Sequence, residues 1–263
     1  MNYKGPWGLN INANRVLPKR RYGFGEGQPL KPMEYLEAAV RATDQGILAA
    51  CGGFSRAVAM TTFIRYKLGN EAIPDGHLVD PLALWEVAKE IDGNKAGDNV
   101  GVNSAQSILI AAKKLNILPD SVPLGTIGAD AASINGALLR APICFAFACH
   151  AGFLPAALGP AGQVAESLGP NALDFMMRGH LMACIGIMPS PDPVDKDPLL
   201  YYADTWSERI GFHGFSMSHL SEMQSCLLEL PWEPYGWDPG QNRGWEKKVV
   251  SYDDIAKRAE AYA

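Results

Sequence analysis

The chain has 263 residues, 48% of them apolar and 19% charged, and its formal net charge is −5. This length allows one large domain or two small ones, with a well-packed core. The apolar content excludes a disordered chain. The slight acidic excess, 28 acidic against 23 basic residues, excludes a nucleic-acid or membrane-surface binder that works through positive charge.

The N-terminal sequence has no apolar stretch of the signal-peptide kind, so no signal peptide is expected. The uncharged run from Ala141 to Ala165 is long enough to span a membrane, but its prolines and glycines predict a buried strand followed by a loop. The cysteines are odd in number, lack zinc-site spacing and indicate a reducing compartment: Cys51, Cys144, Cys149, Cys184 and Cys226. We therefore expect the protein in the cytoplasm or within a viral or other macromolecular assembly.

The first half of the chain is predicted to be helical. Apolar spacing, a proline in a first turn and a serine cap predict helices at Phe54 to Leu68, Pro81 to Ile91 and Ser104 to Asn116. The first of these comes directly after Cys51-Gly52-Gly53. We assign residues 1–44 to an N-terminal strap and residues 45–124 to a helical lobe.

The second half is predicted to be rich in strands, which makes the fold class α+β. After a short helix around Ala131 to Arg140, strands are predicted at Ile143 to Cys149, Leu181 to Met188, Leu199 to Trp206 and Phe212 to Ser218. We assign residues 125–222 to this strand-rich lobe.

Residues 223–263 are predicted to form a C-terminal extension. Its aromatic segment carries Trp232, Trp237 and Trp245. These side chains could form an arm that docks a protein partner, or they could strap the arm over the body of the protein. A last helix is predicted from about Tyr252, because Ser251 and Asp254 have the spacing of a capping box.

Cys51 is the strongest candidate for chemistry. At the first turn of a helix, unpaired backbone N–H groups and the positive end of the helix dipole favour the thiolate, which is the nucleophilic form. Gln45 precedes it by six residues and can return its side-chain amide to the sulfur. With the backbone N–H of Cys51, that amide would make a two-donor oxyanion hole.

A thiolate also needs an imidazole partner and an acceptor that orients the ring. His180 stands at the start of a predicted buried strand, and Asp204 stands at the end of another, two residues before Trp206. His150 is the runner-up base, although a loop follows it. We interpret His77, His213 and His219 as ordinary surface or core residues.

These segments resemble the papain family of cysteine peptidases, most closely its shorter bacterial and viral members. The family segment QGxxxxCxxFS matches Gln45, Gly46, Cys51, Phe54 and Ser55. The strand GHxxxxxG matches Gly179, His180 and Gly186, and the acceptor-x-Trp motif matches Asp204 and Trp206. The resemblance covers about Tyr35 to Phe215, in the same chain order.

The resemblance implies a two-lobe fold in which a helical lobe faces an antiparallel, β-barrel-like lobe across a cleft. It implies that Cys51 is the nucleophile, His180 the general base and acid, Asp204 the residue that orients the imidazole, and Gln45 the oxyanion donor. The thiolate would attack a peptide carbonyl and water would resolve the thioester, with no metal or organic cofactor required.

Three positions depart from the family pattern. Gly52 stands where tryptophan is usual, which we expect to enlarge the primed side of the cleft. Asp204 replaces the usual asparagine, and its charge should favour the imidazolium. Leu48 replaces a disulfide cysteine, in agreement with a reducing compartment. About 50 residues precede Cys51, too few for a long inhibitory propeptide.

The sequence therefore predicts a cysteine peptidase that acts on a peptide or protein substrate, without a nucleic-acid or membrane partner. Two alternatives stay open. One is a papain-fold structural or docking component of a larger assembly, such as a virus particle, with weak or no activity. The other is a cell-wall amidase or endopeptidase that uses the same residues.

Overall fold

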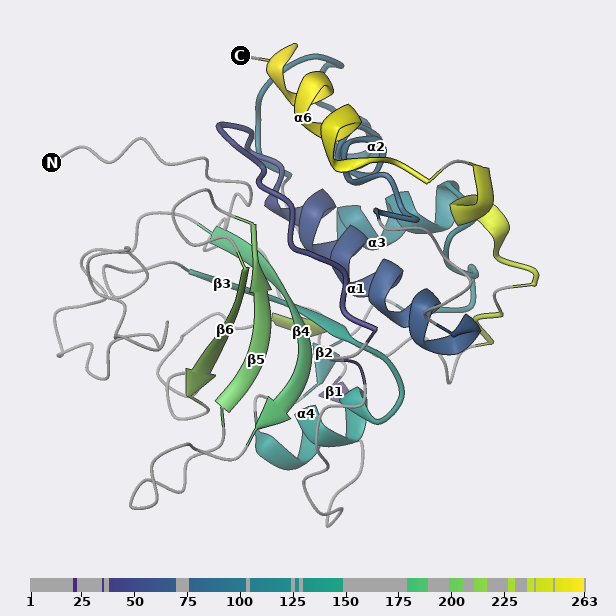
Figure 1. Ribbon diagram of the computed structural model, residues 1–263, viewed down its shortest axis with the longest axis vertical. Helices are drawn as coiled ribbons and strands as arrows, with labels where there is room; N and C mark the ends of the chain where they lie inside the picture. The colour runs from purple at the N-terminus through teal and green to yellow at the C-terminus, as the bar shows by residue number, and fades with distance from the viewer. Residues whose placement is uncertain are drawn as a thin grey trace, which may run out of the picture.

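The computed structural model describes residues 21–22, 35, 38–69, 76–102, 105–123, 126–127, 130–148, 179–188, 199–205, 211–216, 227–229, 236–238, 240–247 and 249–262. Two parts are visible in Figure 1, a group of helices and a twisted sheet with one further helix beside it. This arrangement confirms the α+β class.

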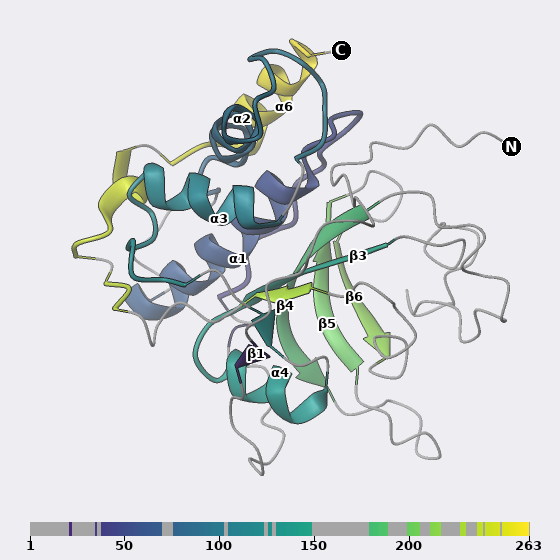
Figure 2. The same cartoon turned by 180° about the vertical axis from the view of Figure 1, so that it is seen from behind.

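The helical part is built around α1 (Cys51–Leu68), in which every residue from Cys51 to Ile64 is buried. Helices α2 (Pro81–Ile91) and α3 (Ala105–Lys114) pack on it, and strand β4 (Gly179–Met188) of the sheet packs on another of its sides (Figure 1 and Figure 2). The prediction of a largely buried helix is confirmed, but α1 begins three residues earlier than expected. Its first turn contains Gly52 and Gly53. Neighbouring helices approach so closely there that a Cβ at either position would clash.

Three further helices begin after a side chain that accepts hydrogen bonds from the first turn, as N-caps do. Asp80 caps α2, Asp130 caps α4 (Ala131–Leu138) and Ser251 caps α6 (Tyr252–Glu260). The bounds predicted for α2 are confirmed. The predicted cap of α3, Ser104, lies outside the described residues.

The sheet has seven strands in the order β1-β2-β7-β3-β4-β5-β6. Their bounds are Arg21–Tyr22 (β1), Thr126–Ile127 (β2), Ile143–Ala148 (β3), Gly179–Met188 (β4), Leu199–Asp204 (β5), Gly211–Ser216 (β6) and Leu227–Glu229 (β7). All neighbours are antiparallel except β1 and β2. Segments from both ends of the chain therefore join the sheet.

The four longer strands, β3 to β6, confirm the predicted ones within about two residues at each end. Strands β1, β2 and β7 were not predicted, because two or three residues are too few for an alternating pattern to show.

One apolar core joins the two parts. It contains Phe54 and Val58 of α1 together with Leu181, Ala183 and Ile185 of β4. This shared core fixes the start of α1 against the sheet. Within the described part of the chain, no helix has both the length and the apolar character to cross a bilayer.

The C-terminal aromatic segment packs against the helical part at Trp237. The indole Nε1 donates a hydrogen bond to the Ile117 carbonyl at 3.0 Å, and the ring centroid lies 5.0 Å from that of Phe63. The end of α1 and the loop after α3 thus hold this residue, as the strapping interpretation predicts. A short 3-10 helix, η6 (Arg243–Lys247), follows, while Trp232 lies outside the described residues.

Candidate active site

Cys51 is the first residue of α1, and its side chain is fully buried. The preceding residue, Ala50, offers no side-chain acceptor to the first turn. Backbone N–H groups at a helix start have no partner within the helix, and the dipole is positive there. A helix start is a common place for an anion in proteins, and a nucleophilic cysteine reacts as its thiolate.

Gln45 lies on a tight turn that leads to Cys51. The backbone N–H of Gly46 donates to Asp44 Oδ1 at 2.7 Å, and that of Leu48 donates to the Gln45 carbonyl at 3.1 Å. Gly46 has a φ of +57°, a conformation that glycine adopts without strain. The Gln-Gly pair thus makes the turn that brings Gln45 back toward the helix start.

His180 and Asp204 lie on neighbouring strands of the sheet. In the β4–β5 ladder Ala183 pairs with Ala203, so His180 and Asp204 are diagonal neighbours on one face. Their side chains meet with His180 Nε2 3.3 Å from Asp204 Oδ1, and both are fully buried. A carboxylate at this distance holds the imidazole in one orientation.

Two sets of hydrogen bonds bring these residues into one region. Ser55 lies one turn after Cys51, and its Oγ donates to the carbonyl of Leu181, next to His180, at 2.6 Å. Thr205 follows Asp204, and its Oγ1 donates to Gln45 Oε1 at 2.6 Å. The Gln45 backbone N–H also donates to the Thr205 carbonyl at 2.9 Å. The first turn of α1 is therefore bonded to the residue next to His180, and Gln45 is bonded to the residue next to Asp204.

The Gln45 side-chain amide also closes its own turn. Its Nε2 donates to the Leu48 carbonyl at 2.7 Å. An amide carries two N–H groups, and this bond uses one of them. The role of Gln45 as an oxyanion donor stays a prediction.

The expectation that Gly52 opens space is wrong. A Cβ built on Gly52 would lie 2.8 Å from Ile108 Cγ1 and 3.3 Å from Val102 Cγ2. The missing side chain is therefore used for close packing with α3 and the segment before it. Leu48, at the position of the family's disulfide cysteine, is fully buried in the core.

The other predicted residues divide into three groups. His77 is a core histidine, as predicted: it is fully buried and hydrogen bonded to Thr43 Oγ1, and burial lowers its pKa to about 4, so it is neutral near pH 7. Cys144 and Cys184 are buried free thiols. Outside the described residues or side chains lie His150, Trp206, His213, His219, Cys149 and Cys226.

Thr205 was missed by the sequence analysis. It binds Gln45 through both its hydroxyl and its carbonyl, and it comes directly after Asp204. No motif marks it, because its partner lies 160 residues away in the sequence.

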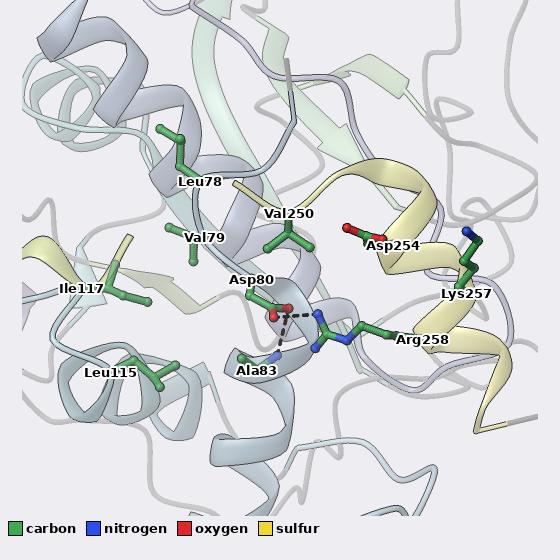
Figure 3. Close-up of a pocket in the computed structure, with 11 residues that line it drawn as sticks. Leu78, Val79, Asp80, Ala83, Leu115, Ile117, Val250, Asp254, Lys257 and Arg258 are labelled. Carbon is green, nitrogen blue, oxygen red and sulfur yellow. Dashed lines mark hydrogen bonds and ion pairs between the residues drawn. The ribbon is translucent and has the colours of Figure 1, made fainter. Parts of the chain in front are cut away.

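A separate pocket of about 490 Å³ lies between the loop before α2, the end of α3 and α6. Figure 3 shows aliphatic side chains on one side and charged residues of α6 on the other. Asp80 Oδ2 and Arg258 Nη1 form an ion pair at 2.7 Å across it. Its lining residues include no cysteine or histidine, so we do not assign nucleophilic chemistry to it. In the described part of the chain no group of three or more His, Cys, Asp or Glu could hold a metal.

The solved structures that are similar to this chain include the following three. Xylellain, a cysteine protease from Xylella fastidiosa, matches 88% of this chain and 98% of its own with a TM-score of 0.57 and 11% identity. The recombinant stem bromelain precursor matches 82% of this chain and 76% of its own, with a TM-score of 0.49 and 12% identity. Digestive procathepsin L2 from Tenebrio molitor matches 75% and 64%, with a TM-score of 0.37 and 11% identity.

Comparisons with protein-family models and with curated proteins gave no match. The similarity to xylellain establishes that the chain has a papain-like fold, which the sequence analysis predicted. At 11% identity it establishes the fold alone.

Proposed function

We propose that this protein is a cysteine peptidase that cleaves peptide bonds through Cys51, His180 and Asp204, with Gln45 as an oxyanion donor. One observation carries the proposal. The buried His180–Asp204 pair lies on strands packed against the start of α1, and the Ser55–Leu181 hydrogen bond fixes that contact.

In the proposed reaction the Cys51 thiolate attacks the carbonyl carbon of a peptide, and a C–S bond forms. The carbonyl oxygen becomes an oxyanion that accepts hydrogen bonds from the Cys51 N–H and the Gln45 amide. The His180 imidazolium then gives its proton to the leaving nitrogen, and the C–N bond breaks. A water molecule, deprotonated by His180, attacks the thioester and releases the acid and the thiolate.

Asp204 determines which ring nitrogen takes part. Because Nε2 faces the carboxylate, Nδ1 is the nitrogen that exchanges the proton with sulfur, leaving group and water. The negative charge of Asp204 stabilises the imidazolium that this cycle requires.

Burial adds a requirement to the proposal. Cys51, His180, Asp204 and Gln45 have no exposed surface in this conformation. A peptide therefore reaches the sulfur only after part of the chain moves. The same burial favours a second candidate function, a papain-fold docking component with little or no turnover.

Labelling with a thiol-directed epoxide tests the nucleophile. Cys144 and Cys184 are matched controls, since both are buried free thiols like Cys51. Burial raises the pKa of Cys184 to about 12, so it should stay a thiol. We expect mass spectrometry to find the adduct on Cys51 first, and Cys51→Ala to abolish hydrolysis of a peptide library.

Equal labelling of the three cysteines, or hydrolysis that survives Cys51→Ala, contradicts the peptidase proposal. Labelling of Cys51 without any turnover supports the docking component. Faster hydrolysis of peptidoglycan fragments than of casein-like peptides would assign the same residues to a cell-wall enzyme.

Substitutions at Asp204 test the orienting role. Asp204→Asn should retain most activity, because an amide oxygen still accepts from His180 Nε2. Asp204→Ala should lower kcat about 100-fold, since general acid–base catalysis contributes ~10²–10⁴. Steady-state kinetics on variants of equal melting temperature measure this, and equal rates for all three proteins mean that Asp204 is misassigned.

A further inference from the structure

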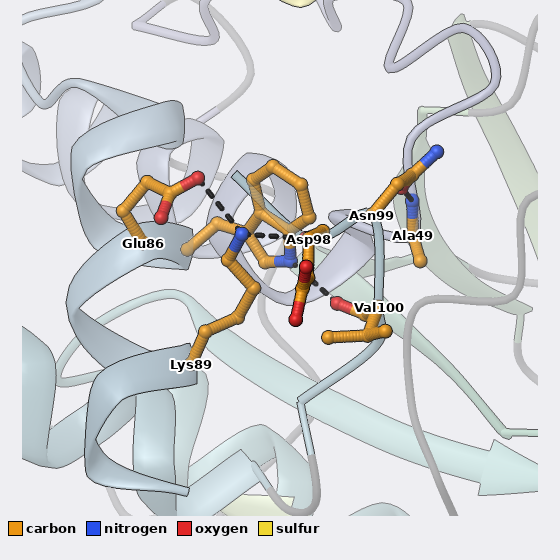
Figure 4. Close-up of polar contacts among 7 residues, drawn as sticks. Ala49, Glu86, Lys89, Asp98, Asn99 and Val100 are labelled. Carbon is orange, nitrogen blue, oxygen red and sulfur yellow. Dashed lines mark hydrogen bonds and ion pairs between the residues drawn. The ribbon is translucent and has the colours of Figure 1, made fainter. Parts of the chain in front are cut away.

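A side chain from outside α1 holds the segment between Gln45 and Cys51. Asn99 Oδ1 accepts a hydrogen bond from the Ala49 backbone N–H at 2.8 Å, and Asn99 Nδ2 donates to the Ile47 carbonyl at 3.2 Å. Figure 4 shows Asn99 reaching across to Ala49. The two bonds lie on either side of Leu48, between the proposed oxyanion donor and the proposed nucleophile.

The loop that carries Asn99 is itself anchored on α2 at both neighbouring residues. Lys89 Nζ donates to the Asp98 carbonyl at 2.6 Å, and Trp85 Nε1 donates to the Val100 carbonyl at 3.1 Å. Figure 4 shows both bonds running from side chains of α2 to this loop. The backbone of Asp98–Val100 is therefore held in place before Asn99 reaches the Ile47–Ala49 segment.

Lys89 makes this anchor rigid. Its side chain is fully buried, and a buried ammonium is stable only with partners. It has the Glu86 carboxylate at 2.8 Å, the Asp98 carbonyl and the face of Trp85, whose ring centroid lies 3.8 Å from Nζ. Because leaving this charge without partners is costly, the loop has little freedom to shift.

Asn99 itself is exposed, unlike the groups that anchor its loop. Hydrogen bonds at an exposed site contribute little to the free energy of unfolding. The pair of bonds from one amide to Ile47 and Ala49 is therefore suited to set the position of that segment more than the stability of the fold.

We infer that Asn99 is a positioning residue for the oxyanion hole. It fixes the backbone between Gln45 and Cys51 and thereby the separation of the two N–H donors that must meet one oxygen. The inference rests on the proposed function, because only an acyl-transfer reaction forms that oxyanion. Small displacements of such donors lower the rate steeply.

The test compares a reaction that forms an oxyanion with one that does not. Peptide hydrolysis needs the donors, whereas alkylation of Cys51 by iodoacetamide occurs at a saturated carbon and needs only the thiolate. Asn99→Ala removes both bonds, and Asn99→Asp keeps the acceptor for Ala49 but loses the donor to Ile47. Asn94→Ala, in the turn after α2, is the matched control.

We expect Asn99→Ala to lower kcat about tenfold or more with KM changed less than about twofold, a loss confined to the transition state. Asn99→Asp should lower kcat by an intermediate factor, and the control Asn94→Ala should leave kcat unchanged. Iodoacetamide alkylation of Cys51 and the melting temperature should stay as in wild type. The double variant Asn99→Ala with Gln45→Ala should have a kcat no lower than that of Gln45→Ala alone. Both substitutions act through the same donor, the Gln45 amide.

An unchanged kcat for Asn99→Ala in an active wild-type background overturns the inference and leaves the proposed function standing. Parallel decreases in hydrolysis, alkylation and melting temperature also overturn it, since they indicate a purely structural role. If the wild-type protein hydrolyses no peptide and Cys51 is not labelled, the proposed function fails, and the inference fails with it.

Discussion

Helices α1 and α2 pack against each other, yet they begin in opposite ways. Before α2, Asp80 has extended backbone (φ −71°, ψ 111°), and its Oδ1 accepts from the N–H groups of Leu82 and Ala83 at 3.0 and 3.2 Å. Before α1, Ala50 has φ −111° and ψ 14°, and its side chain makes no capping hydrogen bond.

The difference is informative because the starts of α4 and α6 resemble that of α2, each with extended backbone and a side-chain cap. A good N-cap stabilises a protein by about 1 kcal/mol over alanine. Helix α1 has alanine at this position, directly before Cys51, and so lacks this gain. A capping side chain there would compete with a thiolate or oxyanion for the N–H groups of the first turn, and alanine does not compete.

The two helix starts also touch, and Gly53→Ala should have the largest effect on stability. A Cβ at Gly53 would lie 2.2 Å from the Pro81 carbonyl oxygen and 3.0 Å from Trp85 Cβ. Backbone must then shift, and overpacking of this kind costs about 3 kcal/mol or more. Urea unfolding monitored by circular dichroism measures it.

Gly52→Ala is the control for that substitution. Its Cβ would meet the Ile108 side chain at 2.8 Å, and a side chain can move more easily than a carbonyl. We expect a clearly smaller loss. Equal losses of unfolding free energy at the two positions would contradict this. They would mean that the contact with the start of α2 is not the reason why residue 53 is glycine.

The stretch that leads into α2 contains the neutral, buried His77. Its pKa is lowered from 6.5 to about 4, mainly by burial, and the charge of Asp80 offsets part of that effect. Above pH 6.5 the imidazole is neutral in both states. Between pH 6.5 and 4 the unfolded chain binds a proton that the folded chain does not, so the free energy of unfolding falls as the pH falls.

The loss from His77 amounts to about 3 kcal/mol by pH 4. His77→Gln keeps an amide that can bind Thr43 and does not titrate. Urea unfolding at a series of pH values should show that the variant is less sensitive to acid than wild type over this range. The same slope in both proteins would contradict a neutral His77.

Asp80→Ala tests the capped start directly. It should lower the free energy of unfolding by about 1–2 kcal/mol, mostly through the lost cap. Arg258→Ala removes the ion pair with Asp80 but leaves the cap, and because Arg258 is 46% exposed its effect should be small. Peptidase activity should be unchanged in both. A larger loss for Arg258→Ala would assign the stabilisation to the ion pair.

Ala50→Ser should have the smallest effect. A serine there supplies a hydroxyl, but a backbone with ψ near 14° does not aim it as the extended backbone of a cap does. We expect no gain in the free energy of unfolding and no change in the iodoacetamide rate of Cys51. A gain of about 1 kcal/mol in the free energy of unfolding, with slower alkylation of Cys51, would contradict this. It would show that the alanine side chain, and not the backbone conformation of residue 50, is what denies α1 a cap.

Local patterns carried most of what could be predicted. The start of α2 follows from the proline in its first turn, Pro81, and the start of α6 follows from Ser251, because such signals act within one turn. Cys51 and Gln45 were recognisable because residues close in sequence make that turn and helix start. The very short strands and the partner of Thr205 were not recognisable from the sequence, since their contacts come from distant segments.

The sequence alone determined the fold class, the longer elements and the residue types at the candidate site, since these depend on neighbours within a turn or a strand. Tertiary structure decided the rest. It placed His180 and Asp204 diagonally on β4 and β5, filled the space beside Gly52 with Ile108, and brought Asn99 to the segment before Cys51. Strand register and helix packing are set by the whole core, and no local pattern records which distant residue a side chain will meet.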